Sequence, residues 1–431
     1  MGLRAGFAQV DITPPLGTEK AGWLRHIVAE EILDPVYART LVLESNGTLM
    51  GFVSLDLLSV RWTQVDQIRT AAESLGIPKA NLMVAATHNH AGPAIVCAGG
   101  TTRDDRYIEF MVDGITHALQ QAITTMVPAK LAVASGTEGR ISFIRRFIMK
   151  DGSVRTHPPA GSPEIRCAEG VMDPELGVLG VKDYDDKVLG FIINFACHPT
   201  HHGGGTAISA GWPGQLSLAV KQAFGDNCVT LFLNGAFGNV HHANPFDPEY
   251  VDDMNHIGSI LAEDVQQLIP AMEFADDVSL AALTTTLQLP IRDIDGPYGL
   301  GAKYPQRFPD DEIYEASIRK LRAKKAQRDY ALAEVQCLRI GDEVALVGIP
   351  AEYFVQLGLR IKMESPLPYT YIAGAANGML GYVPHREAFE RGGYETTIGM
   401  WSKLVPQAGD MLTDAAIDLI NQRASSEEGS S

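Results

Sequence analysis

Cysteine, positive charge and long apolar runs are all scarce in this 431-residue chain. The five cysteines are scattered and odd in number, which argues against a disulfide framework and favours a reduced protein. Lysine and arginine number 35 against 52 acidic residues, and the net charge of −17 argues against a nucleic-acid partner, because phosphate binding needs a basic face. No apolar run approaches the roughly 20 residues that span a bilayer, and the N-terminus has no apolar signal segment. We therefore expect a cytoplasmic protein with no nucleic-acid partner and no stable membrane association.

Strand-type and helix-type segments alternate along nearly the whole chain. Apolar residues make up 45% and charged residues 20%, as in a globular protein with a sizeable core. An Asn-Gly step lies between the strand-type runs 40–43 and 50–55 and is typical of a hairpin turn. Helical spacing over 107–123 places Ile108, Met111, Ile115 and Leu119 on one face. The pattern predicts one large α/β domain with mixed β-sheet layers flanked by helices and an active site at strand ends.

The expected domain covers residues 1–423, with a disordered tail at 424–431. The segment 290–330 contains a Gly-Pro step and a charged helix, which indicates an insertion or lid. Helices are also expected at 63–75, 214–224, 250–268, 311–331 and 410–422, and strands at 82–86, 130–135, 188–196, 228–234, 278–288, 334–339 and 343–349.

Three histidines stand just after two apolar, strand-type runs. Residues 87–93 read Thr-His-Asn-His-Ala-Gly-Pro, and residues 194–200 read Asn-Phe-Ala-Cys-His-Pro-Thr. Imidazoles beside Gly and Pro turns at strand ends are typical of metal sites in α/β enzymes. His88 and His90, two residues apart, would share one face of an extended strand, and His198 can complete the set from a neighbouring strand. One histidine alone is more often structural, but this repeated setting favours a metal-dependent hydrolase.

Further polar residues follow other apolar runs. Residues 234–244 read Asn-Gly-Ala-Phe-Gly-Asn-Val-His-His-Ala-Asn, and their glycines would let backbone N–H groups approach a substrate. Glu352 ends a Gly-Ile-Pro-Ala-Glu phrase, Tyr382 lies in Gly-Tyr-Val, and Tyr394 begins Tyr-Glu-Thr. Each phrase joins a side chain that can bind a metal or substrate to the end of an apolar run.

These phrases, in this order, resemble the catalytic domain of the neutral (non-lysosomal, alkaline) ceramidase family. The likeness covers about residues 5–420. Five phrases carry it: Thr-His-x-His-Ala-Gly-Pro at 87–93, His-Pro-Thr at 198–200 followed by Ser-Ala-Gly-Trp-Pro-Gly at 209–214, Pro-Ala-Glu at 350–352, Gly-Tyr-Val at 381–383 with Tyr-Glu at 394–395, and the opening Val-Asp-Ile-Thr-Pro-Pro at 10–15.

The resemblance implies one zinc ion bound by His88, His198, Glu352 and Tyr382. It also implies that His90 and Tyr394 contact the scissile group and its oxyanion. Independently, two imidazoles and a carboxylate with an open position are the donor set of a catalytic zinc site. We predict that water activated by the metal attacks a carbonyl while His90 and Tyr394 stabilise the tetrahedral oxyanion.

The chain departs from the family pattern at the Gly-Asp-Val-Ser-Pro-Asn phrase, where His241 replaces the serine. We therefore expect no serine-mediated step there, and His241 is a candidate base or substrate contact. Gly211 replaces the acidic residue of another family phrase. We also expect no immunoglobulin-like domain, since only a helix and a tail follow residue 405 in this sequence. These differences favour a small or medium polar substrate over long-chain ceramide.

Four further residues are candidate substrate contacts: Arg145, Arg146, Asn239 and His202. The arginines lie in a basic stretch that could hold a carboxylate, a phosphate or sugar hydroxyls, and an exposed hairpin is the alternative. Three interpretations of His201 and His202 stay open. They could line the pocket, bind a second ion, or belong to a mobile polar loop.

The predicted activity is zinc-dependent hydrolysis of an amide, or of an ester or lactone, in a small-molecule substrate. Three alternatives stay open: a metal-dependent lyase or isomerase acting on a sugar derivative, a true ceramide amidohydrolase, and a binding or scaffold protein without turnover. Homo-oligomerisation also stays open, because the sequence carries no signal for it.

Overall fold

The Asn46-Gly47 step forms the tight turn that the sequence predicts. In the computed structural model of the chain, these residues have φ of 50° and 80° and join β3 (Tyr37–Ser45) to β4 (Thr48–Leu55) in antiparallel register. Positive φ at both central positions gives a two-residue turn whose twist matches that of the flanking strands. The structure describes residues 2–97, 99–247, 249–304 and 311–422, so the predicted tail lies outside the described residues.

β3 and β4 belong to an eight-stranded sheet with the order β14-β12-β11-β6-β1-β3-β4-β5. Its two halves are joined by a short antiparallel contact between the start of β1 and the start of β6. Most neighbours are antiparallel, but β4 and β5, and β12 and β14, are parallel pairs. The remaining strands are β1 (Arg4–Asp11), β5 (Leu82–Ala86), β6 (Val127–Thr137), β11 (Glu175–Asp183), β12 (Val188–Phe195) and β14 (Val229–Asn234).

The outer edges of the two halves come back into contact with each other. Ser54 Oγ in β4 donates to the carbonyl of Phe232 in β14 at 2.6 Å. Asn234 Nδ2, at the end of β14, donates to the carbonyl of Thr87, directly after β5, at 3.0 Å. The loops that follow β5 and β14 therefore meet, although these strands lie at opposite ends of the sheet order.

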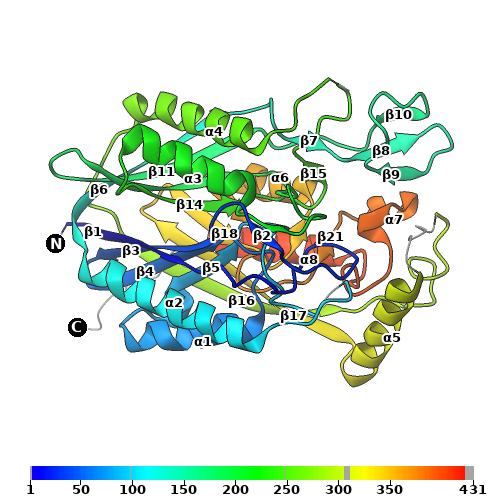
Figure 1. The fold of residues 1–431 in the computed structure, drawn as a ribbon. Helices are drawn as coiled ribbons and strands as arrows, with labels where there is room; N and C mark the ends of the chain where they lie inside the picture. Colours follow the sequence, from blue (N-terminus) through cyan, green and yellow to red (C-terminus); the bar gives the residue numbers. More distant parts are fainter. Residues whose placement is uncertain (1, 98, 248, 305–310, 423–431) are drawn as a thin grey trace.

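Helices cover the outer side of each half, as Figure 1 shows for the pairs α1–α2 and α3–α4. The four apolar residues predicted for one face of the helix at 107–123 are buried in a core shared with β1, β3 and β4. The other helix pair packs on β11, β12 and β14. The bounds are α1 (Trp62–Ser74), α2 (Asp105–Thr124), α3 (Gly211–Phe224) and α4 (Met254–Leu268).

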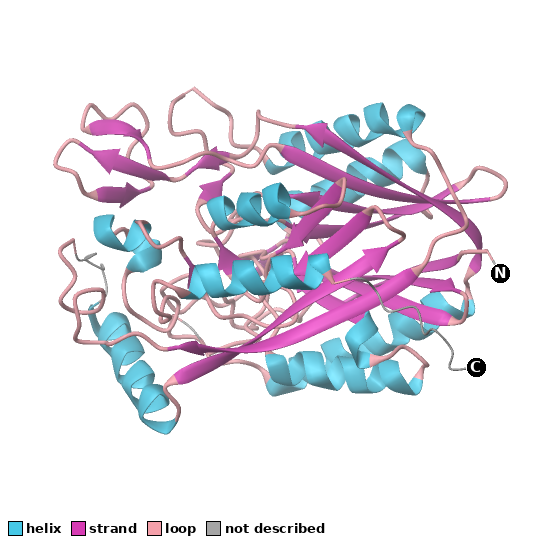
Figure 2. Ribbon diagram, turned by 180° about the vertical axis from the view of Figure 1, so that it is seen from behind, coloured by secondary structure: helices cyan, strands magenta, loops and turns pink. Residues whose placement is uncertain are grey.

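A second, four-stranded sheet packs face to face on the first. Its order is β16-β17-β18-β20, and its buried side chains share one core with those of the eight-stranded sheet. Helices α6 (Val355–Glu364) and α8 (Ala408–Asn421) cover its other face, and Figure 2 shows α8 lying across the strands. The strands are β16 (Leu280–Pro290), β17 (Tyr330–Ile340), β18 (Val344–Gly348) and β20 (Tyr369–Ala373). The predicted fold class, mixed sheet layers flanked by helices, is confirmed.

Short elements complete the described part of the chain. None of its helices is long and apolar enough to cross a bilayer. The charged helix expected at 311–331 is α5 (Asp311–Gln327). The others are β2 (Glu31–Ile32), β7 (Phe143–Ile144), β8 (Arg146–Met149), β9 (Val154–Thr156), β10 (Ile165–Ala168), β13 (Ala207–Ile208), β15 (Val240–His241), β19 (Glu352–Tyr353), β21 (Tyr382–Val383), α7 (Ala388–Arg391) and three 3₁₀ turns, Lys79–Asn81, Ile269–Ala271 and Tyr394–Thr396.

Candidate active site

The three histidines of the two predicted phrases lie side by side. His88 and His90 follow β5, His198 follows β12, and their ligand nitrogens lie within 4.8 Å of one another. The ring centroids are 4.6 Å apart for His88 and His198 and 5.0 Å apart for His90 and His198. All three side chains are buried. The predicted convergence of these residues is therefore present, and it depends on the contact between the two edges of the large sheet.

The two histidines of the first phrase do not converge through strand alternation, as the sequence analysis assumed. β5 ends at Ala86, and His88 has a φ of 67°, in the left-handed region that a non-glycine residue seldom adopts. Such backbone strain is held in place only where the surroundings fix it, and it is frequent at functional sites. A turn, rather than an extended strand, therefore brings the His88 and His90 rings to 4.8 Å.

Backbone carbonyls orient two of the rings. His88 Nδ1 donates to the carbonyl of Leu58 at 2.7 Å, and His90 Nδ1 donates to the carbonyl of Gly22 at 2.7 Å. Each Nε2 therefore carries a lone pair that faces the centre of the cluster. Metal-ligating histidines are oriented in this way by a hydrogen bond from the other nitrogen.

Glu352 and Tyr382 approach the same centre from the second sheet. They lie opposite each other in the parallel pair β19 and β21, and the Tyr382 hydroxyl donates to the Glu352 carboxylate. Glu352 Oε2 lies 3.4 Å from His88 Nε2 and 3.9 Å from His198 Nε2. All four predicted metal ligands thus come together.

The donor set fits a zinc ion. His88 Nε2 is buried and has no hydrogen-bond partner among the described residues, although a carboxylate oxygen lies close to it. Such an orphaned lone pair is costly unless a cation or a proton satisfies it. Burial and neighbouring positive groups lower the pKa of His90 and His198 well below the usual range. These rings are therefore neutral, which is the form that binds a metal.

Arg145 adds a fixed positive charge beside the histidines. Its Nε donates to Glu395 Oε1 at 2.8 Å, and its guanidinium lies 5.3 Å from the ring centre of Tyr382. Burial disfavours the charge, but Tyr382 and Glu395 outweigh that effect and raise the pKa of Arg145 above its usual value. Its Nη2 is buried without a hydrogen-bond partner in the described residues, so one donor remains for a ligand.

Comparisons with known proteins agree with this architecture. No protein-family model matches the chain. Neutral ceramidase of Pseudomonas aeruginosa is 24% identical over 464 aligned residues, which span 89% of this chain and 67% of that protein. The crystal structure of neutral ceramidase from Pseudomonas aeruginosa and a ceramidase complexed with C2 each match at 21% identity and a TM-score of 0.76, covering 97% of this chain and 74% and 75% of theirs. The chain is thus similar to a neutral ceramidase in sequence and in fold.

Three of the four predicted substrate contacts lie away from the histidine cluster or have other partners. Arg146 uses all three nitrogens on Glu169, Glu395 and the carbonyl of Gly392. Asn239 is buried and bonds the backbone N–H of Val355 and the side chain of Gln356, at the start of α6. His202 is exposed in a turn and has a φ of 57°. Only Arg145, from the predicted four, lies against the histidine cluster in the described structure.

The basic stretch is also the hairpin that the sequence analysis kept as an alternative. β8 and β9 pair antiparallel and β10 adds a third strand, and the Lys150-Asp151 turn is exposed. The arginines nevertheless face inward, because Glu395 accepts hydrogen bonds from both of them. The basic stretch therefore forms an exposed hairpin turn and also contributes two arginines to a buried charge network.

The glycine-rich phrase at 234–244 serves packing rather than backbone contact with a substrate. A Cβ on Gly238 would lie 2.4 Å from the carbonyl oxygen of Glu352, so only glycine fits there. The Gly238 N–H donates to the carbonyl of Tyr353 at 2.8 Å. This close approach fixes β19, and with it the Glu352 carboxylate.

His241 and Tyr394 border the cluster. The His241 ring lies 6.4 Å from that of His198 and 4.5 Å from that of His157. Tyr394 stacks on Trp401 at 6.0 Å and meets Tyr382 edge-on at 5.5 Å. Burial raises the pKa of the Tyr394 hydroxyl above its usual value, so it stays a hydrogen-bond donor.

Sequence reasoning did not assign a role to Glu395, Thr200, His242 or Asp252. Glu395 stands beside Tyr394 in the Tyr-Glu phrase, and its place in that phrase is a signal that could have found it. Thr200 and His242 lie within quoted phrases, next to predicted residues. Asp252 is distant from every phrase and had no signal.

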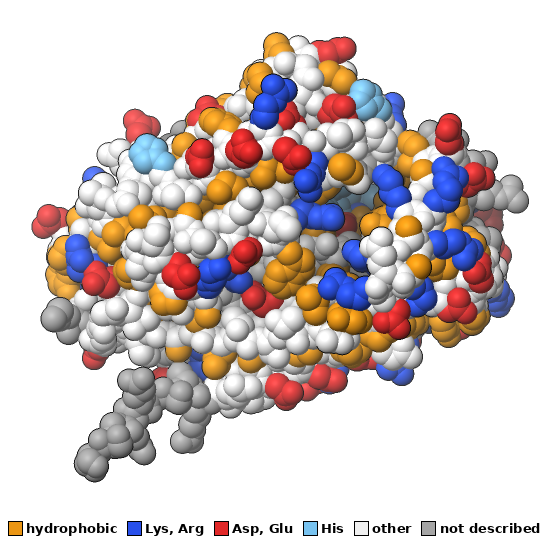
Figure 3. Space-filling model, turned by 90° about the horizontal axis from the view of Figure 1, so that it is seen from below, with side chains coloured by type: hydrophobic (Ala, Val, Ile, Leu, Met, Phe, Trp, Pro, Cys, Tyr) orange, Lys and Arg blue, Asp and Glu red, His pale blue; other side chains and the backbone are white. Residues whose placement is uncertain are grey.

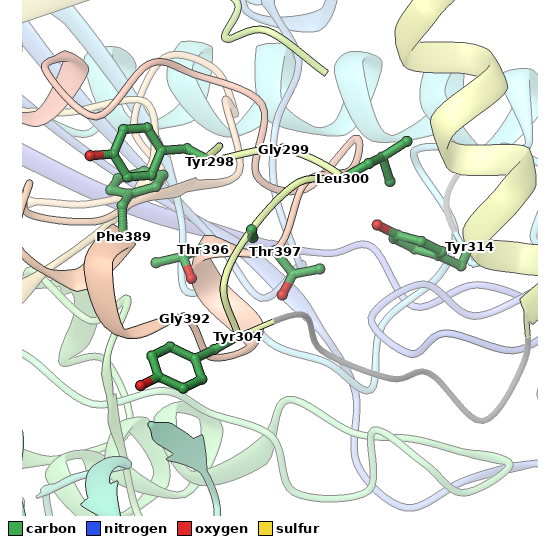
Figure 4. A pocket seen from close by; sticks show the side chains of 10 residues that line it. Tyr298, Gly299, Leu300, Tyr304, Tyr314, Phe389, Gly392, Thr396 and Thr397 are labelled. Carbon is green, nitrogen blue, oxygen red and sulfur yellow. The ribbon is translucent and has the colours of Figure 1, made fainter. Parts of the chain in front are cut away.

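The predicted insertion lines a cavity next to Tyr394 (Figure 4). Tyr298 and Leu300 line it from the 294–304 loop, Tyr314 from α5, and Thr396 from the turn that follows Tyr394. The insertion packs here through Ile294, Ile318 and Leu321 on Ile398. A segment far along the chain thus forms one wall near the site, and its movement as a lid stays a prediction.

Cationic side chains gather on the same side of the molecule. Figure 3 shows Lys and Arg side chains around a hollow in which a His side chain is visible. A positive region on a protein of net charge −17 attracts polar or anionic small molecules.

Proposed function

We propose that this chain is a zinc-dependent amidohydrolase that acts on small or medium polar substrates. The observation that carries the proposal is that His198 and Glu352 lie close to the buried Nε2 of His88. This nitrogen has no hydrogen-bond partner among the described residues. The likeness to a neutral ceramidase supports the cleavage of an amide bond. The cationic surroundings support a polar substrate.

The ion would be held by His88, His198, Glu352 and Tyr382. A bound zinc ion supplies a Lewis acid that polarises a carbonyl and lowers the pKa of water. We assign Arg145 Nη2 and the Tyr394 hydroxyl as the donors to the developing oxyanion, because both side chains pack on Tyr382, which is one of the predicted metal ligands. Fixed donors stabilise developing charge without reorganisation at the moment of reaction.

His90 suits proton transfer better than oxyanion stabilisation. Its Nδ1–H is used on the carbonyl of Gly22, so the neutral ring has no N–H on Nε2 to offer an oxyanion. Nε2 can instead take a proton from the attacking water and pass it to the leaving amine. The role of His90 in the proposal is therefore that of a general base.

Turnover in ¹⁸O-labelled water tests the reaction class. The substrate panel contains N-acyl amino acids, N-acyl sugars, lactones and short ceramides, and products are identified by mass spectrometry. A hydrolase places one labelled oxygen in the carboxylate product. A product without label would favour the lyase or isomerase, and cleavage of ceramides alone would favour a true ceramide amidohydrolase.

Removal of the metal is expected to abolish turnover. Dialysis against a chelator should leave protein without zinc, and one equivalent of zinc per chain should restore activity. The folded state should also lose stability, by about 4 kcal/mol where free zinc had been at a thousand times its dissociation constant. Elemental analysis and thermal unfolding with and without zinc check this. Full activity in protein shown to be free of metal would contradict the proposal.

Tyr394→Phe is expected to lower kcat by roughly 10²–10³-fold, since one oxyanion donor is lost while the ring packing on Trp401 is kept. KM should change little, because the hydroxyl acts mainly in the transition state. The matched control is Tyr184→Phe, which removes an exposed hydroxyl bonded to Asp276. Equal kcat values for both variants would remove Tyr394 from the mechanism.

A further inference from the structure

His201, His242 and Asp252 form a second group of metal-binding side chains, outside the cluster of the active site. One ligand atom from each residue lies within 4.8 Å of the other two, and the two groups share no residue. His201 Nε2 lies 3.1 Å from Asp252 Oδ1, and His242 Nδ1 lies 2.6 Å from the same oxygen. The two imidazole rings stack with their centroids 3.8 Å apart. Two imidazoles therefore meet at one carboxylate oxygen.

Three separate segments of the chain supply these residues. His201 belongs to the loop after β12, His242 ends outside β15 by one residue, and Asp252 lies two residues before α4. The loop after β12 also carries the predicted ligand His198, three residues before His201. An ion in this group would link the three segments to one another and hold the loop of His198 in place.

The side chains of the group have the charge states that bind a metal. Burial lowers the pKa of His242 despite its hydrogen bond to Asp252, so this ring is neutral at pH 7. Burial raises the pKa of Asp252, but hydrogen bonds from His201 and His242 outweigh it and hold that pKa well below its usual range. A neutral imidazole and an ionised carboxylate are the forms that coordinate a metal.

A hydrogen bond on the far side of the His242 ring orients it toward the group. His242 Nε2 lies 2.8 Å from Thr200 Oγ1. When an ion takes Nδ1, the ring proton moves to Nε2, and the Thr200 hydroxyl can accept it because a hydroxyl both donates and accepts. The hydroxyl thus serves either tautomer of the ring. Metal-binding histidines are held by such a hydrogen bond from the other nitrogen.

The distances predict a site of modest affinity. Two ligand atoms of a tetrahedral zinc ion at its usual bond lengths lie about 3.3 Å apart. The 3.1 Å between His201 and Asp252 is close to that value. The 2.6 Å between His242 and Asp252 is a hydrogen-bond distance, and it must open as the ion replaces the shared proton.

Two further features lower the affinity relative to the active site. His201 Nδ1 is buried without a hydrogen-bond partner among the described residues, so a proton that moves there gains no hydrogen bond. The Asp252 side chain is 33% exposed, so water would complete the coordination of an ion. The active site offers four predicted protein ligands, so we expect it to fill first.

We propose that His201, His242 and Asp252 bind a second zinc ion, more weakly than the active site, and that this ion stabilises the loop after β12. Two imidazoles favour zinc over calcium and magnesium, which prefer oxygen ligands. Because the ion is weakly bound, dialysis into metal-free buffer should remove it and leave one zinc per chain. The inference goes beyond the proposed hydrolysis, and no step of that reaction needs this ion.

A zinc titration of the dialysed full chain tests the proposal. Isothermal titration calorimetry should show one further zinc bound to a chain that already holds one. Asp252→Asn keeps the size of the side chain and should weaken this step by at least about 100-fold, since loss of a residue that only supports a ligand costs about 10–100-fold. His201→Ala should weaken the step likewise.

The matched control is His256→Ala, which removes an exposed histidine from the first turn of α4 and should bind the second zinc like the wild type. Saturation of the wild type at one zinc would overturn the proposal. A second step of unchanged affinity in Asp252→Asn would overturn it as well. So would competition by calcium at about 1 mM, which would assign the step to oxygen ligands alone.

Thermal unfolding gives a readout that does not depend on turnover. Excess zinc should raise the Tm of the one-zinc wild type and of His256→Ala by a few degrees, because an ion that binds only the folded chain stabilises it. The Tm of Asp252→Asn should stay unchanged, and circular dichroism checks that this variant folds. A Tm that rises equally in all three proteins would contradict the assignment.

The two proposed metal sites fail independently of each other. If the active site bound no zinc, the titration would still show one weak step that is lost in Asp252→Asn. If the second site were absent, one tightly bound zinc would remain and no weak step would follow. Turnover of the wild type should be the same with one zinc and with two, and a second zinc that changes kcat would contradict the structural role.

Discussion

Glu352→Gln is expected to remove zinc from the protein and with it nearly all turnover. Glu352 Oε2 lies 3.4 Å from His88 Nε2 and 3.9 Å from His198 Nε2, and Glu352 is the one carboxylate among the four predicted ligands. An amide of the same size keeps the packing but loses the charge that attracts the cation. Loss of a residue that only supports a ligand costs about 10–100-fold in affinity or activity, so loss of the ligand itself should cost more.

The control for this prediction is Glu343→Gln, the same change on an exposed residue of the turn between β17 and β18. Metal content by elemental analysis and kcat/KM are measured on both variants. Glu343→Gln should bind one zinc and turn over normally. A Glu352→Gln protein that keeps one zinc and full activity would show that the ion is bound elsewhere.

Local patterns in the sequence were sufficient for most of the framework. The Asn46-Gly47 turn, the apolar face of α2 and most of the long strands follow from periodicity and turn chemistry, and they are confirmed. β1, β11, β20 and α6 were not predicted. β11 contains two glycines within its apolar run, and β20 is a five-residue aromatic strand beside prolines, so neither gives a clear alternation signal.

The long-range contacts of the site were beyond pattern reasoning. The contact between the β4–β5 edge and β14 depends on single hydrogen bonds such as Ser54 to Phe232, which no spacing rule predicts. Asp56 shows the same limit, because its carboxylate accepts hydrogen bonds from Arg39 and from the N–H of Tyr37, which lie 17 and 19 residues away in the sequence. The sequence phrases were sufficient to predict the four candidate ligands. The residues that hold these ligands in place could be identified only from the folded structure.

No sequence pattern predicted the buried hydrogen-bond network around Glu395. A substitution of Glu395 is the second prediction with a large expected effect. Glu395→Gln is expected to destabilise the folded protein by about 3–5 kcal/mol, because two buried arginines then lose their shared counter-charge. The wild-type carboxylate accepts from Arg145 at 2.8 Å and from Arg146 at 2.7 Å, and no part of its side chain is exposed. Urea unfolding of the variant and the wild type at neutral pH measures the difference. The control, Glu44→Gln, breaks an exposed pair with Arg4 and should cost less than about 1 kcal/mol.

The stability difference between the wild type and Glu395→Gln should depend on pH. A loss of packing alone would not produce this dependence. Burial would raise the pKa of Glu395, but the charges of Arg145 and Arg146 outweigh it and hold the pKa at about 2, below the usual 4.5. A depressed pKa means that the stabilisation is complete above pH 4.5 and is lost as the pH falls towards about 2. That depression corresponds to about 3 kcal/mol, in line with the expected loss in Glu395→Gln. The gap between wild type and variant should therefore narrow steadily below pH 4.5, since protonated glutamate and glutamine are both neutral. A gap that stays constant down to pH 3 would assign the loss to altered packing rather than to the buried charge.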